Sequence, residues 1–140
     1  MIRCTIGVMA YNEEQMISHV LHALLAQQPT SCIILEIVVV ASGCTDRTVE
    51  FAQAIANDYP HIQIIAEAER GGKAKAINQL LSVARGDVVV LVGADTLPEQ
   101  NAIDELVRPF SDPTVGMTGA QVVPLNDPAT FMGLTVHVLW

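Results

Sequence analysis

Positive charge is scarce in this sequence of 140 residues. Lys and Arg number 7 against 15 Asp and Glu, which gives a net charge of -8 and an isoelectric point near 4.7. There is no basic stripe of the kind that follows a phosphate backbone, so nucleic acid is not expected as a partner. An acidic chain that binds an anionic ligand needs a bound cation, or a local cluster of Lys and Arg, at the binding site.

Cysteines and long apolar runs are few. The three cysteines (Cys4, Cys32 and Cys44) are scattered and form no CxxC pair, which argues against a zinc knuckle and favours reduced thiols. The N-terminal residues reach Glu13 and Glu14 too soon for a signal peptide. No apolar run approaches the ~20 residues of a membrane span. We therefore expect a cytoplasmic protein, with peripheral membrane association only through a segment beyond residue 140.

Strand-like and helix-like segments alternate along the chain. Hydrophobic residues make up 51% of the sequence, enough for a folded core. Nearly continuous apolar runs predict strands, and apolar residues at helical spacing predict helices. The expected strands are Arg3–Met9, Glu36–Ala41, Ile62–Ala66 and Asp87–Val92, with a weaker one at Val115–Val123. The expected helices are Glu13–Ala26, Asp46–Asn57, Lys73–Ala84 and Glu99–Phe110. This order predicts a three-layer α/β/α sandwich with a mostly parallel central sheet.

Ligands of such sheets bind outside the carboxyl ends of the strands, so the loops that follow the strands are of most interest. In the first, AYNEE, Tyr11 can pack on a ring, and Asn12 can bond a base or simply cap the turn. In the second, ASGCTDRT, Ser42 can reach a base or ribose, while Asp46 is expected to cap the next helix.

The third loop, in EAERGGKAKAIN, concentrates cations in a chain that has few. Its Gly-rich turn enters a helix, and Arg70, Lys73 and Lys75 lie close together, as expected of an anion site. The segment is not a P-loop, because the first Gly is missing and Ala74 stands where Ser or Thr would hold magnesium.

The fourth loop places Asp95 directly after a buried apolar run. A carboxylate in that position needs a partner. It can either bind a divalent cation shared with phosphates or cap its own turn. We favour the cation because the other three loops converge on the same edge of the sheet.

Together these segments resemble family 2 glycosyltransferases, which have the GT-A fold. The matching segments are AYNEE (10–14), VVASGCTDRT (39–48), GGKAKAIN (71–78) and GDVVVLVGADTLPE (86–99). The resemblance implies a metal site for Mn²⁺ or Mg²⁺ at Asp95, the last acid of a DxD-type motif. It implies nucleotide-binding roles for Ala10, Tyr11, Asn12, Glu13, Ser42, Lys73, Asn78 and Ala94. The chain departs from the family pattern at Met9, Ala41, Ser42 and Gly93, of which the last three replace acids.

The implied function is transfer of a sugar from a nucleotide-diphosphate-sugar donor, a UDP-sugar before a GDP-sugar, to an unknown acceptor, with inversion. The sequence stops inside an apolar stretch (131–140), so we expect a single nucleotide-sugar-binding domain over 1–140 that continues further. The catalytic base is expected beyond Trp140, and residues 1–140 alone would then transfer little sugar. The alternatives are a nucleotidyltransferase, a non-catalytic nucleotide-binding or interaction module, and an unrelated α/β domain.

Overall fold

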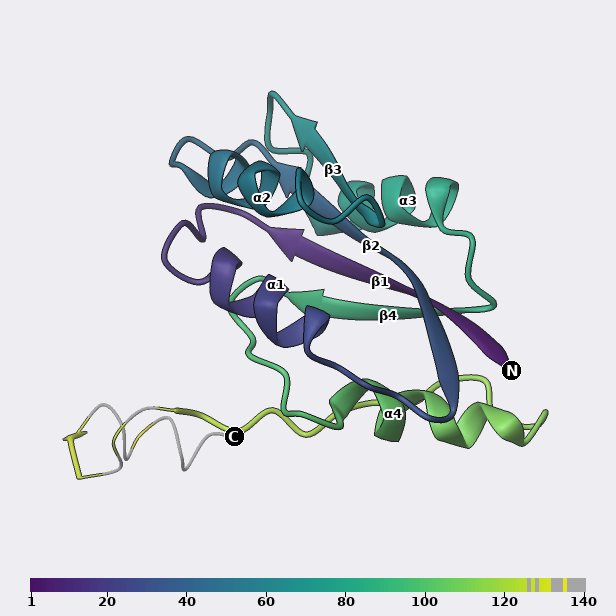
Figure 1. Ribbon diagram of the computed structural model, residues 1–140. Helices are drawn as coiled ribbons and strands as arrows, with labels where there is room; N and C mark the ends of the chain where they lie inside the picture. The colour runs from purple at the N-terminus through teal and green to yellow at the C-terminus, as the bar shows by residue number, and fades with distance from the viewer. Residues whose placement is uncertain (126, 128, 132–134, 136–140) are drawn as a thin grey trace.

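The structure is a computed structural model that describes residues 1–125, 127, 129–131 and 135. Strands and helices alternate along the described residues (Figure 1). In chain order they are β1 (Ile2–Ala10), α1 (Ile17–Leu25), β2 (Cys32–Ser42), α2 (Thr48–Ala56), β3 (Ile62–Glu67), α3 (Lys73–Val83), β4 (Val88–Gly93), α4 (Ala102–Val107) and the 3-10 helix η1 (Arg108–Ser111).

The strands form one sheet in the order β3-β2-β1-β4, and every pair of neighbours is parallel. The register places the last residues of the strands side by side: Ala10 opposite Ala41, Met9 opposite Gly93, and Ser42 opposite Glu67. All the carboxyl ends therefore meet at one edge of the sheet, as expected for βαβ units.

Helices cover both faces of the sheet, which confirms the expected three-layer sandwich (Figure 1). On one face Ile6 and Val8 pack with the buried residues of α1, α2 and α4. On the other face Val38 and Val40 pack against Leu80 of α3. Gly7 permits this close approach of α3, because a Cβ atom there would lie 2.1 Å from a methyl carbon of Leu80.

A buried polar network closes the opposite edge of the sheet, where β4 begins. The Glu36 carboxylate accepts hydrogen bonds from the Thr5 hydroxyl (2.9 Å), from the Arg85 backbone amide (2.8 Å) and from Arg85 Nε (2.7 Å). Burial raises the pKa of Glu36, but the Arg85 and Thr5 hydrogen bonds outweigh it and hold the pKa below its usual range. The network attaches the α3–β4 loop to the amino-terminal halves of β1 and β2, remote from the carboxyl edge.

Each expected helix is shorter than predicted, and the difference is largest for α1 and α4. Helix α1 begins at Ile17 rather than Glu13, since residues 14–16 form turns in which the Glu13 carbonyl accepts hydrogen bonds from the amides of Met16 (3.0 Å) and Ile17 (2.9 Å). Helix α4 begins at Ala102 rather than Glu99, and it changes to a 3-10 helix at Arg108. Pro109 lacks the amide hydrogen that an α-helix would need at that point.

The weak strand expected at Val115–Val123 is wrong. These residues have no regular secondary structure, and large apolar side chains such as Met117 (87% exposed) and Val123 (62% exposed) lie open to solvent. A strand needs a partner for its backbone groups, and none of the described strands pairs with this segment. The apolar run at 131–140 lies mostly outside the described residues. No helix within the described part of the chain is long and apolar enough to cross a membrane.

Candidate functional site

A cavity of about 300 Å³ lies at the carboxyl edge of the sheet, between the ends of β1, β2 and β4 and the beginning of α3. It brings together many of the residues predicted from the sequence: Ala10, Tyr11, Glu13, Ser42, Lys73 and Asp95. Six further residues line it: Met9, Val40, Arg70, Gly72, Ala76 and Gly93. The cavity thus lies where parallel α/β sheets bind ligands.

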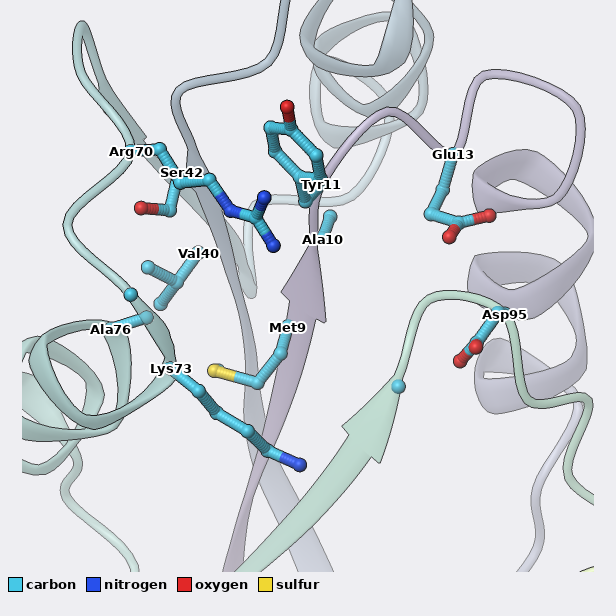
Figure 2. Close-up of a pocket in the computed structure, with 12 residues that line it drawn as sticks. Met9, Ala10, Tyr11, Glu13, Val40, Ser42, Arg70, Lys73, Ala76 and Asp95 are labelled. Atoms are coloured by element: carbon cyan, nitrogen blue, oxygen red, sulfur yellow. The ribbon is translucent and has the colours of Figure 1, made fainter.

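Opposite charges face each other across this cavity. Figure 2 shows the carboxylates of Glu13 and Asp95 on one side and the cationic groups of Arg70 and Lys73 on the other. Burial, followed by the negative charges of Asp95 and Asp46, raises the pKa of Glu13. One wall therefore favours a cation and the other favours an anion, although the chain as a whole is acidic.

Arg70 is an important cavity residue that is not among the residues predicted to bind nucleotide. Its guanidinium carbon lies 3.9 Å from the centroid of the Tyr11 ring, a cation–π contact between two loops (Figure 2). The sequence did carry a signal for it, since Arg70 belongs to the cation cluster before the third helix. Its contact with Tyr11, 59 positions away, is visible only in the fold.

Asn12 does not line the cavity, and its side chain joins two loops. Its backbone has a positive φ of 51°. Its side-chain oxygen accepts a hydrogen bond from the Thr45 amide (2.8 Å). The amide group therefore joins the loop after β1 to the loop after β2 and is not among the residues that line the cavity. Asn12 positions its neighbours Tyr11 and Glu13.

Asp46 serves as the expected cap. Its Oδ1 accepts hydrogen bonds from the Thr48 amide (3.0 Å) and the Thr48 hydroxyl (2.5 Å) at the beginning of α2. Its Oδ2 accepts one from the Glu14 amide (3.1 Å). These contacts lower the pKa of Asp46, although burial acts in the opposite direction.

Two further residues predicted to bind nucleotide are not part of the cavity lining. Ala94 is 1% exposed, belongs to the core, and donates its amide hydrogen to the Met9 carbonyl (2.9 Å). Asn78 is exposed on α3 and is not part of the cavity lining. The motif spacing that suggested them does not tell which side of an element faces the ligand.

Asp95 is the residue on which a metal site would depend. Its side chain is exposed, and its one hydrogen bond among the described residues comes from the Thr96 hydroxyl at 3.3 Å. The described residues contain no group of three or more His, Cys, Asp or Glu side chains that could enclose a metal ion. One or two carboxylates suffice when phosphate oxygens and water complete the coordination of Mg²⁺. The residues present therefore fit a cation shared with a ligand, not one held by protein alone.

The carboxylates of α4 are occupied by structural contacts. Asp104 Oδ1 accepts hydrogen bonds from the amides of Thr30 (2.6 Å) and Ser31 (2.8 Å), which lower its pKa. Glu105 is paired with Arg108 on the same helix. Neither carboxylate is placed to accept a proton from a substrate in the cavity.

Known proteins share this fold and sequence pattern. The family described as "Glycosyl transferase family 2" matches residues 5–137. The mannosyltransferase PcManGT from Pyrobaculum calidifontis, solved with GDP-Man and Mn²⁺, is 34% identical with a TM-score of 0.74, covering 82% of this chain and 34% of that one. Glucosyl-3-phosphoglycerate synthase from Mycobacterium tuberculosis, solved with Mn²⁺, UDP and phosphoglyceric acid, is 25% identical with a TM-score of 0.63, covering 78% and 39%. Poly-beta-1,6-N-acetyl-D-glucosamine synthase of Staphylococcus aureus is 32% identical over 107 residues, 76% of this chain and 25% of that protein.

The parallel sheet, its flanking helices and these similarities define the GT-A fold of glycosyltransferases. The chain belongs to glycosyl transferase family 2. This membership confirms the resemblance seen in the four motifs and does not support a nucleotidyltransferase or an unrelated α/β domain. The chain spans between 17% and 36% of the length of four curated relatives.

Proposed function

We propose that the cavity binds the nucleoside diphosphate of a sugar donor, and that the protein transfers this sugar to an acceptor. The observation that carries the proposal is the division of charge in the cavity, with Arg70 and Lys73 facing Glu13 and Asp95. A diphosphate bound together with a divalent cation is complementary to both walls at once.

Each wall has its own part in donor binding. The ring of Tyr11 and the guanidinium of Arg70 offer a flat surface for the nucleotide, and Lys73 at the beginning of α3 attracts the diphosphate. Asp95, with Glu13 beside it, would hold Mn²⁺ or Mg²⁺. Such a cation would neutralise charge on the departing nucleoside diphosphate.

The base of the donor nucleotide and the stereochemistry of transfer are proposed from the sequence. We keep a UDP-sugar as the first candidate on the strength of the motif resemblance, with a GDP-sugar as the alternative. The relatives named above were solved with GDP-Man in one case and with UDP in another. Inversion at the anomeric carbon and a cytoplasmic location remain predictions from the sequence.

A thermal unfolding series tests the proposal. The melting temperature is measured with UDP, GDP and their sugars, each with Mn²⁺ and with EDTA. A ligand at ~100 times its dissociation constant stabilises a fold by about 2.7 kcal/mol, which is a rise of several degrees. We expect such a rise with one nucleotide in Mn²⁺, and a smaller one in EDTA.

Two matched variants make the test specific. Asp95→Asn should lose the Mn²⁺-dependent part of the rise, because it removes the cation ligand. Asp58→Asn makes the same change at an exposed carboxylate outside the cavity and should behave like the parent protein. An absence of any rise with every nucleotide would contradict the proposal.

A further inference from the structure

Glu67 is a buried carboxylate that does not line the cavity. It is the last residue of β3, and its side chain is 6% exposed. The Lys75 ammonium, which reaches back from the first turns of α3, lies 3.0 Å from Glu67 Oε1. A buried carboxylate is costly unless it is paired, so the burial of Glu67 depends on its ion pair with Lys75.

The Ser42 hydroxyl is hydrogen-bonded to the loop that follows Glu67, the β3–α3 loop (residues 68–72). Ser42 and Glu67 are opposite each other at the ends of β2 and β3. The Ser42 hydroxyl lies near the carboxylate, although the two do not form a well-aligned hydrogen bond, and together with Lys75 it lowers the pKa of Glu67. The same Ser42 oxygen accepts a hydrogen bond from the Gly71 amide at 3.0 Å.

A second contact holds the strand ends and this loop together. The Gly43 amide donates to the Glu67 carbonyl (3.0 Å). Gly43 has a φ of +65°, and a Cβ atom there would lie 2.4 Å from the Arg70 backbone nitrogen. The backbone of the β3–α3 loop is therefore packed directly onto the end of β2, which restricts the conformations open to the loop.

This loop supplies the positive wall of the cavity. Arg70 lies within it and stacks on Tyr11, and Lys73 begins the helix that follows it. The Glu67–Lys75 ion pair spans the whole segment, since it joins the residue before the loop to the first turn of α3.

We propose that Glu67 is a positioning residue, which acts through Lys75 and Ser42 to hold the β3–α3 loop so that Arg70 and Lys73 face the cavity. The part of this inference that concerns affinity rests on the proposed nucleotide binding. The part that concerns the position of Arg70 does not.

Ser42 stands where the family pattern has an acid, and the position of Glu67 explains this difference. An Asp at position 42 would lie beside Glu67 on the neighbouring strand, and two close carboxylates repel each other. Restoring the family residue alone is therefore expected to weaken nucleotide binding, and removing the charge of Glu67 in the same chain should recover part of the loss.

The first experiment uses the ligand-free protein and the NMR signals of the Arg70 side chain. In the parent protein the Tyr11 ring should shift these signals upfield, because the guanidinium lies over its face. Glu67→Gln should return them toward the values of a free arginine, while the backbone spectrum outside residues 67–75 stays that of the folded protein. Glu69→Gln is the matched control: Glu69 is exposed in the same loop and has no hydrogen bond or ion pair to the part of the chain that the structure describes.

The second experiment measures the affinity for UDP and GDP in Mn²⁺ by calorimetry. We expect Glu67→Gln to weaken the affinity for the tighter-binding nucleotide by about tenfold, the size expected for one lost charge-assisted contact. Glu69→Gln should change it less than about twofold. Lys75→Met, at a side chain that is 59% exposed, breaks the same ion pair and should give at least the same loss as Glu67→Gln, because it leaves Glu67 buried without its cation.

The outcomes separate the two proposals. An unchanged Arg70 signal in Glu67→Gln and Lys75→Met would overturn the positioning role, whatever the nucleotide does. A parent protein that binds neither nucleotide would overturn the proposed function, and the Arg70 signal would still decide the role of Glu67. A Ser42→Asp variant that binds better than the parent would also contradict the inference.

Discussion

Two carboxylates, Glu36 and Asp95, lie at opposite ends of the strands and differ in burial and in hydrogen bonding. Glu36 is 2% exposed and accepts hydrogen bonds from Thr5 and Arg85. Asp95 is exposed and, among the described residues, has only a weak contact with Thr96. Glu36 therefore stabilises the fold, whereas the Asp95 carboxylate is accessible to a ligand.

Arg85→Ala tests the stabilising role of Glu36. The variant keeps the backbone hydrogen bond but removes the guanidinium, so we expect a loss of about 1–3 kcal/mol of unfolding free energy at neutral pH. The pKa of Glu36 is lowered in the folded protein, so its contribution is complete above its ordinary pKa of 4.5 and is lost as the pH falls through the folded value. The difference between parent and variant should therefore narrow below about pH 4.5.

The measurement is thermal unfolding of both proteins across a pH series. Arg108→Ala is the matched control, because Arg108 pairs with Glu105 where both side chains are more than half exposed. Exposed pairs of this kind contribute about 0–1 kcal/mol. An equal effect of the two variants at neutral pH would contradict the account of Glu36.

At the level of elements, loops from different strands hold each other in place around the cavity. The loop after β1 is attached to the loop after β2 through Asn12 and Asp46. The loop after β3 is attached to the end of β2 through Ser42. The cavity therefore depends on contacts between loops as much as on the strands that carry them.

Asn12→Ala should disturb this arrangement in two ways. Alanine at a φ of 51° costs about 1–2 kcal/mol, and the hydrogen bond to the Thr45 amide is lost as well. We expect a lower melting temperature and a weaker affinity for the nucleotide, because Tyr11 and Glu13 flank this position.

Asn12→Gly separates the two effects. Glycine accepts the positive φ but lacks the amide, so its melting temperature should lie between those of the parent and of Asn12→Ala. Its nucleotide affinity should still be reduced. Parent-like affinity in both variants would show that Asn12 does not position the cavity.

The strands and the location of the site could be predicted from the sequence, because both depend on local patterns. Apolar runs such as IVVVA (37–41) mark buried strands, and parallel strands bring the loops at their ends together. The four loops flagged in this way do line or border the cavity, with Ala10, Tyr11, Glu13, Ser42, Lys73 and Asp95 in its lining.

The parts that could not be predicted depend on contacts between distant residues. The hydrogen bond from the Glu13 amide to the Thr48 hydroxyl, 35 residues away, arises from the packing of two loops on each other. The turn of Asn12 toward Thr45 and the contact of Arg70 with Tyr11 have the same origin. The segment Val115–Val123, expected as a weak strand, has no partner among the described strands, and local pattern cannot reveal the lack of a partner.

At the scale of the whole molecule, the two edges of the sheet have separate tasks. The edge where β4 begins is closed by Glu36, Thr5 and Arg85, and the carboxyl edge is left open as a cavity with separated charges. Because the acidic wall offers too few ligands to enclose a metal among the described residues, a cation and a nucleotide should bind there together.

Paramagnetic line broadening by Mn²⁺ tests this central claim most directly. Amide signals of labelled protein are followed while Mn²⁺ is added, with and without UDP or GDP. We predict strong broadening at residues 93–96 and at Glu13 only when a nucleotide is present. Broadening that is equally strong without nucleotide, or that is centred elsewhere in the chain, would contradict the account.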